Sequence, residues 1–98
     1  MASNETARLV VGKDGSHRLE GELTFASVPK LAAAHPRHPA TTIDLGGVTR
    51  ADSAGLALLL EWLRTAGEAG EELVYRDLPE QLAAIARVSN LADLLPAS

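Results

Sequence analysis

Residues 41–60 read TTIDLGGVTRADSAGLALLL, and they contain the transition that decides the fold. A short run rich in β-branched residues ends at Asp44, a Gly-Gly pair follows, and an apolar run begins after Asp52. The first run predicts a strand buried on both faces, and the second predicts a helix that begins near Ser53. A helix N-terminus presents unpaired N–H groups and the positive end of the helix dipole. We therefore expect any chemistry of this chain to be concentrated around Ser53, where an anion or a polar group of a partner is favoured.

Short strands and helices are predicted on both sides of this segment. Residues 8–11 and 17–23 alternate partially between polar and apolar, and Lys13-Asp14-Gly15 between them is typical of a hairpin turn. Apolar spacing predicts a helix over 24–34 that includes Phe25, Val28, Leu31 and Ala32 and ends near His35-Pro36. Thr24 or Ser27 is its possible cap, and Pro29 is tolerable only in its first turn. The other predicted elements are a loop over 36–39, a strand over 40–45, a turn at Gly46-Gly47, a helix over 53–66, a strand over 73–75, a helix over 80–88 and a short helix around 91–95.

This order of elements predicts an α/β fold. Strands that alternate with helices form parallel sheets with crossover helices, here after an antiparallel hairpin. We expect a mixed sheet of four or five strands with three or four helices chiefly on one face. A chain of 98 residues holds one modest core, so residues 1–98 are expected to form a single domain with its core over about residues 7–96.

Composition limits the classes of function. Hydrophobic residues make up 46% and charged residues 22%, and the apolar run at 54–60 is too short to cross a bilayer. The net charge is −4 and the basic residues are scattered, which argues against nucleic acid as a partner. The absence of cysteine excludes disulfides and thiolate metal sites, and with no export segment in view we expect a cytoplasmic location.

Asp52, Ser53 and Gly55 match the D-S-x-G turn that opens the second helix of STAS domains, the family of anti-sigma-factor antagonists and related regulatory modules, and the chain resembles that family. The similarity is greatest to its MlaB-type branch, the STAS subunits of bacterial phospholipid-transport ABC complexes. That similarity is carried by GEL at 21–23, IDL at 43–45, VTR at 48–50 and DSAGLALLL at 52–60.

The resemblance implies a non-catalytic cytoplasmic subunit, peripheral to the inner membrane through its complex. Such a subunit binds and supports the ATPase of an ABC transporter, together with permease and substrate-binding subunits, and helps to maintain outer-membrane lipid asymmetry in Gram-negative bacteria. ATP, ADP and magnesium would belong to the ATPase. The alternative is an anti-sigma-factor antagonist regulated by phosphorylation of Ser53. A phosphate there would gain from the helix N-terminus but would add about −1.5 to −2 charge beside Asp52.

Asp52 and Ser53 also have a purely structural explanation, because both residue types are preferred helix N-caps worth about 1 kcal/mol. By the resemblance, we interpret Ser53 as a contact residue. On a helical wheel the core stripe falls on Leu56, Leu59, Leu60 and Leu63, and a second apolar strip remains. The predicted partner surface therefore consists of Asp52, Ser53, Ala54, Leu58 and Trp62, with Leu31 from the preceding helix and Arg50 at the rim. The alternative for Leu58 and Trp62 is that a neighbouring helix covers them.

The sequence offers little for catalysis or metal binding. The ADSAG segment at 51–55 lacks the first glycine of a nucleophile elbow, and all three histidines precede Ser53. His35 and His38 lie among prolines with no cysteine or nearby carboxylate to complete a metal site. Gly46-Gly47 matches no phosphate-binding loop. We expect no catalytic residue, no metal and no cofactor in this chain.

Overall fold

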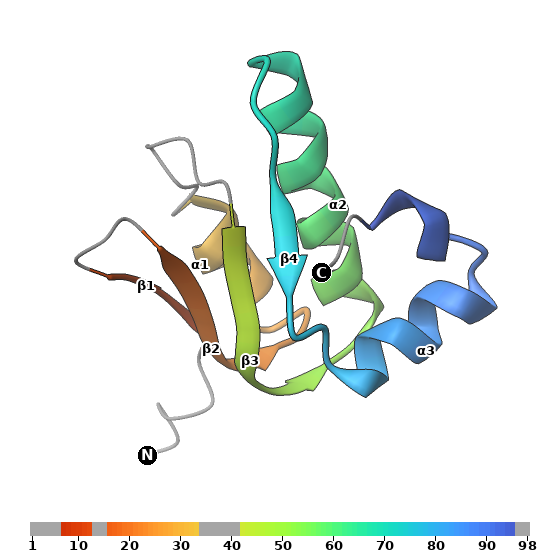
Figure 1. Ribbon diagram of the computed structural model, residues 1–98. Coiled ribbons are helices and arrows are strands. Elements are labelled where there is room, and N and C mark those ends of the chain that lie inside the picture. The colour runs from red at the N-terminus through yellow and green to blue at the C-terminus, as the bar shows by residue number, and fades with distance from the viewer. Residues whose placement is uncertain (1–6, 13–15, 34–41, 96–98) are drawn as a thin grey trace.

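The computed structural model describes residues 7–12, 16–33 and 42–95, which form a four-stranded mixed sheet with its helices gathered on one side (Figure 1). The elements, in chain order, are β1 (Arg8–Val11), β2 (His17–Leu23), α1 (Val28–Ala33), β3 (Thr42–Ala51), α2 (Ser53–Glu68), β4 (Val74–Arg76), α3 (Glu80–Val88) and the 3-10 helix η2 (Ala92–Leu94). The predicted turn at 13–15, the predicted helix end near His35-Pro36, the loop at 36–39 and the start of the third strand at 40–41 lie outside the described residues.

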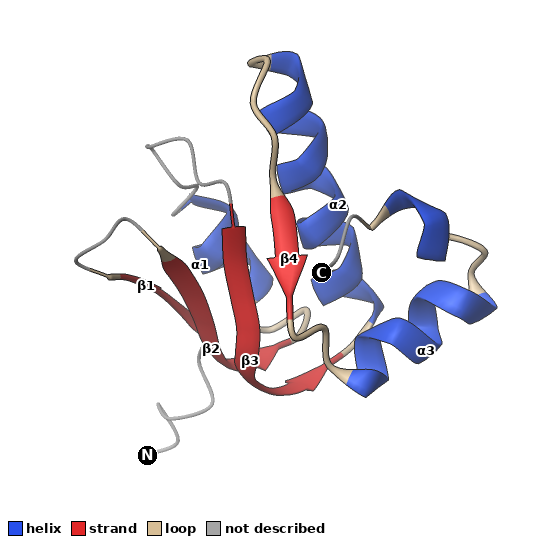
Figure 2. Cartoon of the chain, viewed as in Figure 1, coloured by secondary structure: helices blue, strands red, loops and turns tan. Residues whose placement is uncertain are grey.

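The sheet has the order β1-β2-β3-β4, so the α/β fold with a mixed sheet is confirmed (Figure 2). β1 and β2 pair antiparallel as a hairpin does, whereas β2–β3 and β3–β4 pair parallel through the crossovers that contain α1 and α2. α2 contacts α1, α3 and β3. No helix in the described part of the chain is long and apolar enough to cross a membrane.

The core lies between the sheet and the helices. Alternate residues of the strands point toward the helices, which gives β2 and β3 their buried Leu19, Leu23, Ile43 and Leu45. α2 contributes the largest buried side chain, Trp62, and β4 contributes Tyr75. This packing fixes where the end of β3 meets the start of α2.

Gly46 and Gly47 do not form the predicted turn, because β3 continues through both to Ala51. The glycine at position 47 is explained by close packing. A Cβ there would lie 2.8 Å from Glu20 Cγ and 2.9 Å from the Leu19 carbonyl oxygen, at a shift in the register between β2 and β3. A pair of glycines that permits close approach of two strands looks like a turn signal in sequence alone.

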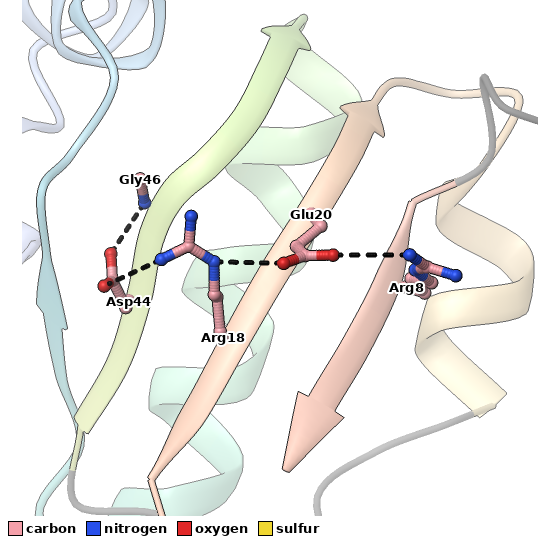
Figure 3. Close-up of polar contacts among 5 residues, drawn as sticks. All are labelled: Arg8, Arg18, Glu20, Asp44 and Gly46. Carbon is pink, nitrogen blue, oxygen red and sulfur yellow. Dashed lines mark hydrogen bonds and ion pairs between the residues drawn. The ribbon is translucent and has the colours of Figure 1, made fainter. Parts of the chain in front are cut away.

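The open face of the sheet carries a row of charged side chains that crosses three strands (Figure 3). Glu20 on β2 accepts from Arg8 on β1 at 3.5 Å and from Arg18 Nε at 3.1 Å. Arg18 also reaches Asp44 on β3 at 3.4 Å, and Asp44 in turn accepts the Gly46 N–H at 2.7 Å. The helices are therefore on the opposite face from this row.

α2 is rotated relative to the predicted core stripe. The buried residues of its first three turns include Gly55, Leu59 and Trp62, which have the spacing i, i+4, i+7 of one helix face. Of the predicted stripe, Leu56 and Leu59 are buried, whereas Leu60 and Leu63 are only partly buried and pack against the edge of the core. Gly55 explains the rotation, because a Cβ there would lie 2.4 Å from the Leu23 carbonyl oxygen. The glycine side of α2 can approach β2 more closely than any other, and it is the side that faces the sheet.

Candidate functional site

Asp52 joins three segments at the carboxyl end of the parallel strands. Its Oδ1 accepts the Ala54 N–H at 2.9 Å and the Gly55 N–H at 3.2 Å, which makes it the N-cap of α2. Its Oδ2 accepts the Phe25 N–H at 3.2 Å, and its own N–H donates to the Leu23 carbonyl at 3.2 Å. The carboxylate therefore holds the end of β2, the turn that follows it and the start of α2 together.

Ser53 is the first residue of α2, and its side chain is exposed. Two N–H groups of the first turn, which the sequence suggested were open to an anion, donate to Asp52 instead. A phosphate ion at this N-terminus would have to displace or share these bonds with a carboxylate of the same charge sign. Ser53 itself remains exposed at this helix start.

Phe25 is a site residue that the sequence analysis missed. The predicted helix over 24–34 begins only at Val28, and residues 24–27 form a turn in which the Phe25 side chain is 75% exposed. The structure has the alternative in which Ser27 precedes the helix and Pro29 lies in its first turn. A proline is tolerated only in the first turn of a helix, so the helix has to begin close to Pro29 and leave Phe25 in front of it. The Asp52 hydrogen bond then places Phe25 beside the start of α2.

The other predicted residues of this turn lie at the same end of the sheet. Arg50 is exposed and precedes the buried Ala51, so the two side chains leave β3 on opposite faces. Ala54 is half-buried. The N–H of Ala51 donates to Gln81 Oε1 at 2.7 Å, so α3 also supports this end of β3. In parallel sheets this carboxyl end is where functional residues commonly gather.

Leu31, Leu58 and Trp62 do not form an exposed strip. They are 2%, 5% and 2% exposed, respectively, and all belong to the core. Leu58 and Trp62 are instead covered by the domain itself, which is the alternative interpretation of the sequence. The predicted exposure was wrong because the wheel was centred on the leucine-rich side of α2, while the packing is centred on the side of Gly55.

The exposed face of α2 below Ser53 carries Ala57, Glu61, Arg64 and Glu68. Arg64 pairs with Glu61 and, at 2.6 Å, with Glu68. The hydrogen bond from the Arg64 guanidinium lowers the pKa of the Glu61 carboxyl. Within the described residues there is no group of three or more His, Cys, Asp or Glu side chains that could hold a metal ion. The exposed part of the candidate site therefore consists of Ser53 and Phe25, and the Arg64 ion pairs lie further along α2.

Comparison with known proteins gives a family and a fold. Residues 10–96 match the family model described as "Mlab, STAS domain". No curated protein matches. Among solved structures, the anti-sigma factor antagonist SpoIIAA in its unphosphorylated form is similar at 18% identity and a TM-score of 0.64, over 95% of this chain and 88% of that one. The phosphorylated form of this cell fate determinant of Bacillus is similar at 17% identity and a TM-score of 0.65, over 95% and 91%.

A candidate anti-sigma factor antagonist from Thermotoga maritima has a TM-score of 0.71 at 14% identity, over 93% of this chain and 84% of that one. At these identities the similarity between structures shows the shared STAS fold. The family match covers the segment from β1 to the residue after Leu95, so it includes the whole Asp52 site.

Proposed function

The chain belongs to the MlaB-like family of STAS domains, and from this membership we propose that it is a non-catalytic accessory subunit that binds the ATPase of a phospholipid-transporting ABC complex. STAS domains are in general regulatory or accessory domains, and the fold of this chain is that of anti-sigma-factor antagonists. In the proposed role the chain is cytoplasmic in a Gram-negative cell. It reaches the inner membrane only through a complex that also contains permease and substrate-binding subunits, and it supports outer-membrane lipid asymmetry.

The observation that carries the proposal is the exposed Ser53 at the start of α2, next to Asp52, whose carboxylate also binds the backbone N–H of the exposed Phe25. An aromatic or apolar centre with polar groups at its edge is the usual composition of a protein–protein interface. The backbone of this surface is already fixed by the bonds of Asp52. A surface that is ordered before binding loses less conformational entropy when it binds.

The environment of Ser53 supports contact rather than catalysis. Asp52 is the adjacent acidic residue, and its carboxylate accepts three backbone hydrogen bonds. Both carboxylate oxygens are engaged by the backbone, which favours a structural role for Asp52 over that of a general base. His17 is buried in β2. We propose that nucleotide and magnesium are bound by the ATPase partner and that this chain binds no cofactor of its own.

A second candidate function is an anti-sigma-factor antagonist whose Ser53 is phosphorylated. The exposure of Ser53 favours it, since a kinase can reach the hydroxyl, and one of the similar structures is described as a phosphorylated form. The Asp52 carboxylate opposes it, because a phosphoserine would be placed beside a like charge. The family match favours the first function.

The two functions are separated by capture of partners from native cells with the tagged full chain. The first predicts that an ABC ATPase co-purifies, and that Ser53→Arg abolishes its capture without a change in melting temperature. Ser89→Arg is the matched control, because Ser89 is an exposed serine at the end of α3. Capture of an anti-sigma kinase in place of the ATPase would support the second function, and an ATPase yield unaffected by Ser53→Arg would show that the proposed surface is wrong.

A further inference from the structure

Phe25 stands apart from the other aromatic residues. The chain has one Phe, one Trp and one Tyr. Trp62 and Tyr75 are among the largest fully buried side chains, whereas Phe25 is 75% exposed. A small domain with three aromatic side chains gives up a large part of its available core volume when one of them is left in water. An exposed aromatic residue in such a chain calls for a role outside the core.

The exposure of Phe25 comes from an ordered turn. Ser27 Oγ accepts the Thr24 N–H at 3.0 Å, and its hydroxyl donates to the Glu22 carbonyl at 2.7 Å. Ser27 itself is buried. The N–H groups of Ser27 and Val28 both donate to the Thr24 carbonyl at 2.9 Å. The Phe25 N–H is taken by Asp52 Oδ2. These bonds fix the backbone on each side of Phe25 and keep the residue out of α1.

We propose that Phe25 is the anchor residue of the ATPase interface, where its ring enters an apolar pocket of the partner, and that Asp52 is its positioning residue. This inference rests on the proposed function. The Oδ2 bond ties the turn that carries Phe25 to the helix start that carries Ser53, so one carboxylate sets the relative position of the backbone segments from which the two side chains project. The partner chemistry that fits is an aliphatic pocket bordered by a hydrogen-bonding group for Ser53.

The other exposed apolar side chains do not share this setting. Val10 and Val11 lie in the edge strand β1, Val88 lies at the end of α3 and Leu94 lies in η2. Val88, which is 89% exposed, is the matched control for the loss of an exposed apolar side chain. Truncation of an aromatic anchor usually costs more binding energy than truncation of peripheral contacts.

The experiment measures the affinity of the full chain for the isolated ATPase subunit by calorimetry, with melting temperatures recorded for each variant. We expect Phe25→Ala to weaken binding by at least about tenfold with no change in melting temperature. Val88→Ala should change the affinity by less than about twofold. Wild-type affinity in Phe25→Ala, while Ser53→Arg abolishes binding, would overturn the anchor role and leave the proposed function standing. Absence of binding by the wild-type chain would instead reject the proposed function itself.

Asp52→Asn tests the positioning role. The amide oxygen can still cap α2, since Asn is as good an N-cap as Asp, but the amide NH2 cannot accept the Phe25 N–H. We expect this variant to weaken binding severalfold in the wild-type background and to have no further effect in Phe25→Ala. Equal losses in both backgrounds would show that Asp52 acts independently of Phe25, which contradicts the positioning role.

Discussion

The hydroxyl of Tyr75 donates a 2.7 Å hydrogen bond to the backbone carbonyl of Leu59, so the second turn of α2 is tied to β4 inside the core. Burial raises the pKa of Tyr75 far above its usual range, because the phenolate cannot be solvated there. An unfolded tyrosine titrates near pH 10. Ionisation above that pH is therefore available only to the unfolded chain, and the domain loses stability as the pH rises.

We predict that the free energy of unfolding falls above about pH 10 by about 1.4 kcal/mol per pH unit from this residue alone. Below that pH the contribution of Tyr75 is fully present. Tyr75→Phe should remove this part of the alkaline slope and cost about 1 kcal/mol at neutral pH through the lost hydrogen bond. Urea unfolding of both proteins between pH 8 and 11 checks the prediction, and parallel slopes above pH 10 would contradict it.

Gly55→Ala should destabilise the domain by about 1–3 kcal/mol, even though alanine is the better helix former. The added Cβ would meet the Leu23 carbonyl oxygen at 2.4 Å, so α2 has to move away from β2. Gly67→Ala is the control in the same helix, because no atom lies within 4 Å of a Cβ at that position. The free energy of unfolding of Gly67→Ala should rise by about 0.5–1 kcal/mol. Chemical denaturation of both decides whether close packing is the reason for Gly55.

Trp62→Ala should lower the free energy of unfolding by about 3–5 kcal/mol, since Trp62 is a central core residue. Its affinity for the ATPase should change little once the concentration of folded protein is taken into account. Denaturation and calorimetry on the same preparation separate these effects. A tenfold loss of affinity with an unchanged melting temperature would instead show that Trp62 belongs to the interface.

Ser27→Ala should cost about 1–3 kcal/mol, because it leaves the Thr24 N–H without its side-chain acceptor in a half-buried turn. Ser89→Ala removes an exposed serine hydroxyl and should change stability by less than about 0.5 kcal/mol. The Ser27 variant should also loosen the turn that holds Phe25. Hydrogen exchange at the Phe25 amide is the direct measurement, and unchanged protection there would show that Asp52 alone orders the turn.

The sequence predicted the order of strands and helices well because that order depends on local apolar spacing. The start of α2 was also predicted, since Asp52 and Ser53 are strong N-cap residues and Asp52 is the cap in the structure. The placement of individual side chains depends on contacts between distant segments. Trp62 was placed on the surface because the approach of Gly55 to Leu23, more than thirty residues earlier, leaves no trace in the periodicity of α2.

The predictions for Phe25 and for the Gly46-Gly47 pair were wrong for related reasons. The periodicity of residues 25–32 is helical, but Pro29 and the side chain of Ser27 start the helix later. The two glycines have the composition of a turn, yet they lie within a strand that packs closely against its neighbour. Side-chain bonds within the turn decided the first case, and contact with a neighbouring strand decided the second.

The charged row on the open face of the sheet has a consequence for which strand alignments the chain can adopt. Exposed ion pairs of this kind add little to stability, so Arg8, Glu20, Arg18 and Asp44 do not hold the sheet together. Because their charges alternate in sign across the strands, opposite charges are neighbours in only one alignment of the three strands, and that alignment is favoured. A slip of β2 by one residue would turn Arg18 and Glu20 into the core and Leu19 into water. A second sheet stacked on this face would have to remove these charges from water, so the charged row makes the face poorly suited to self-association.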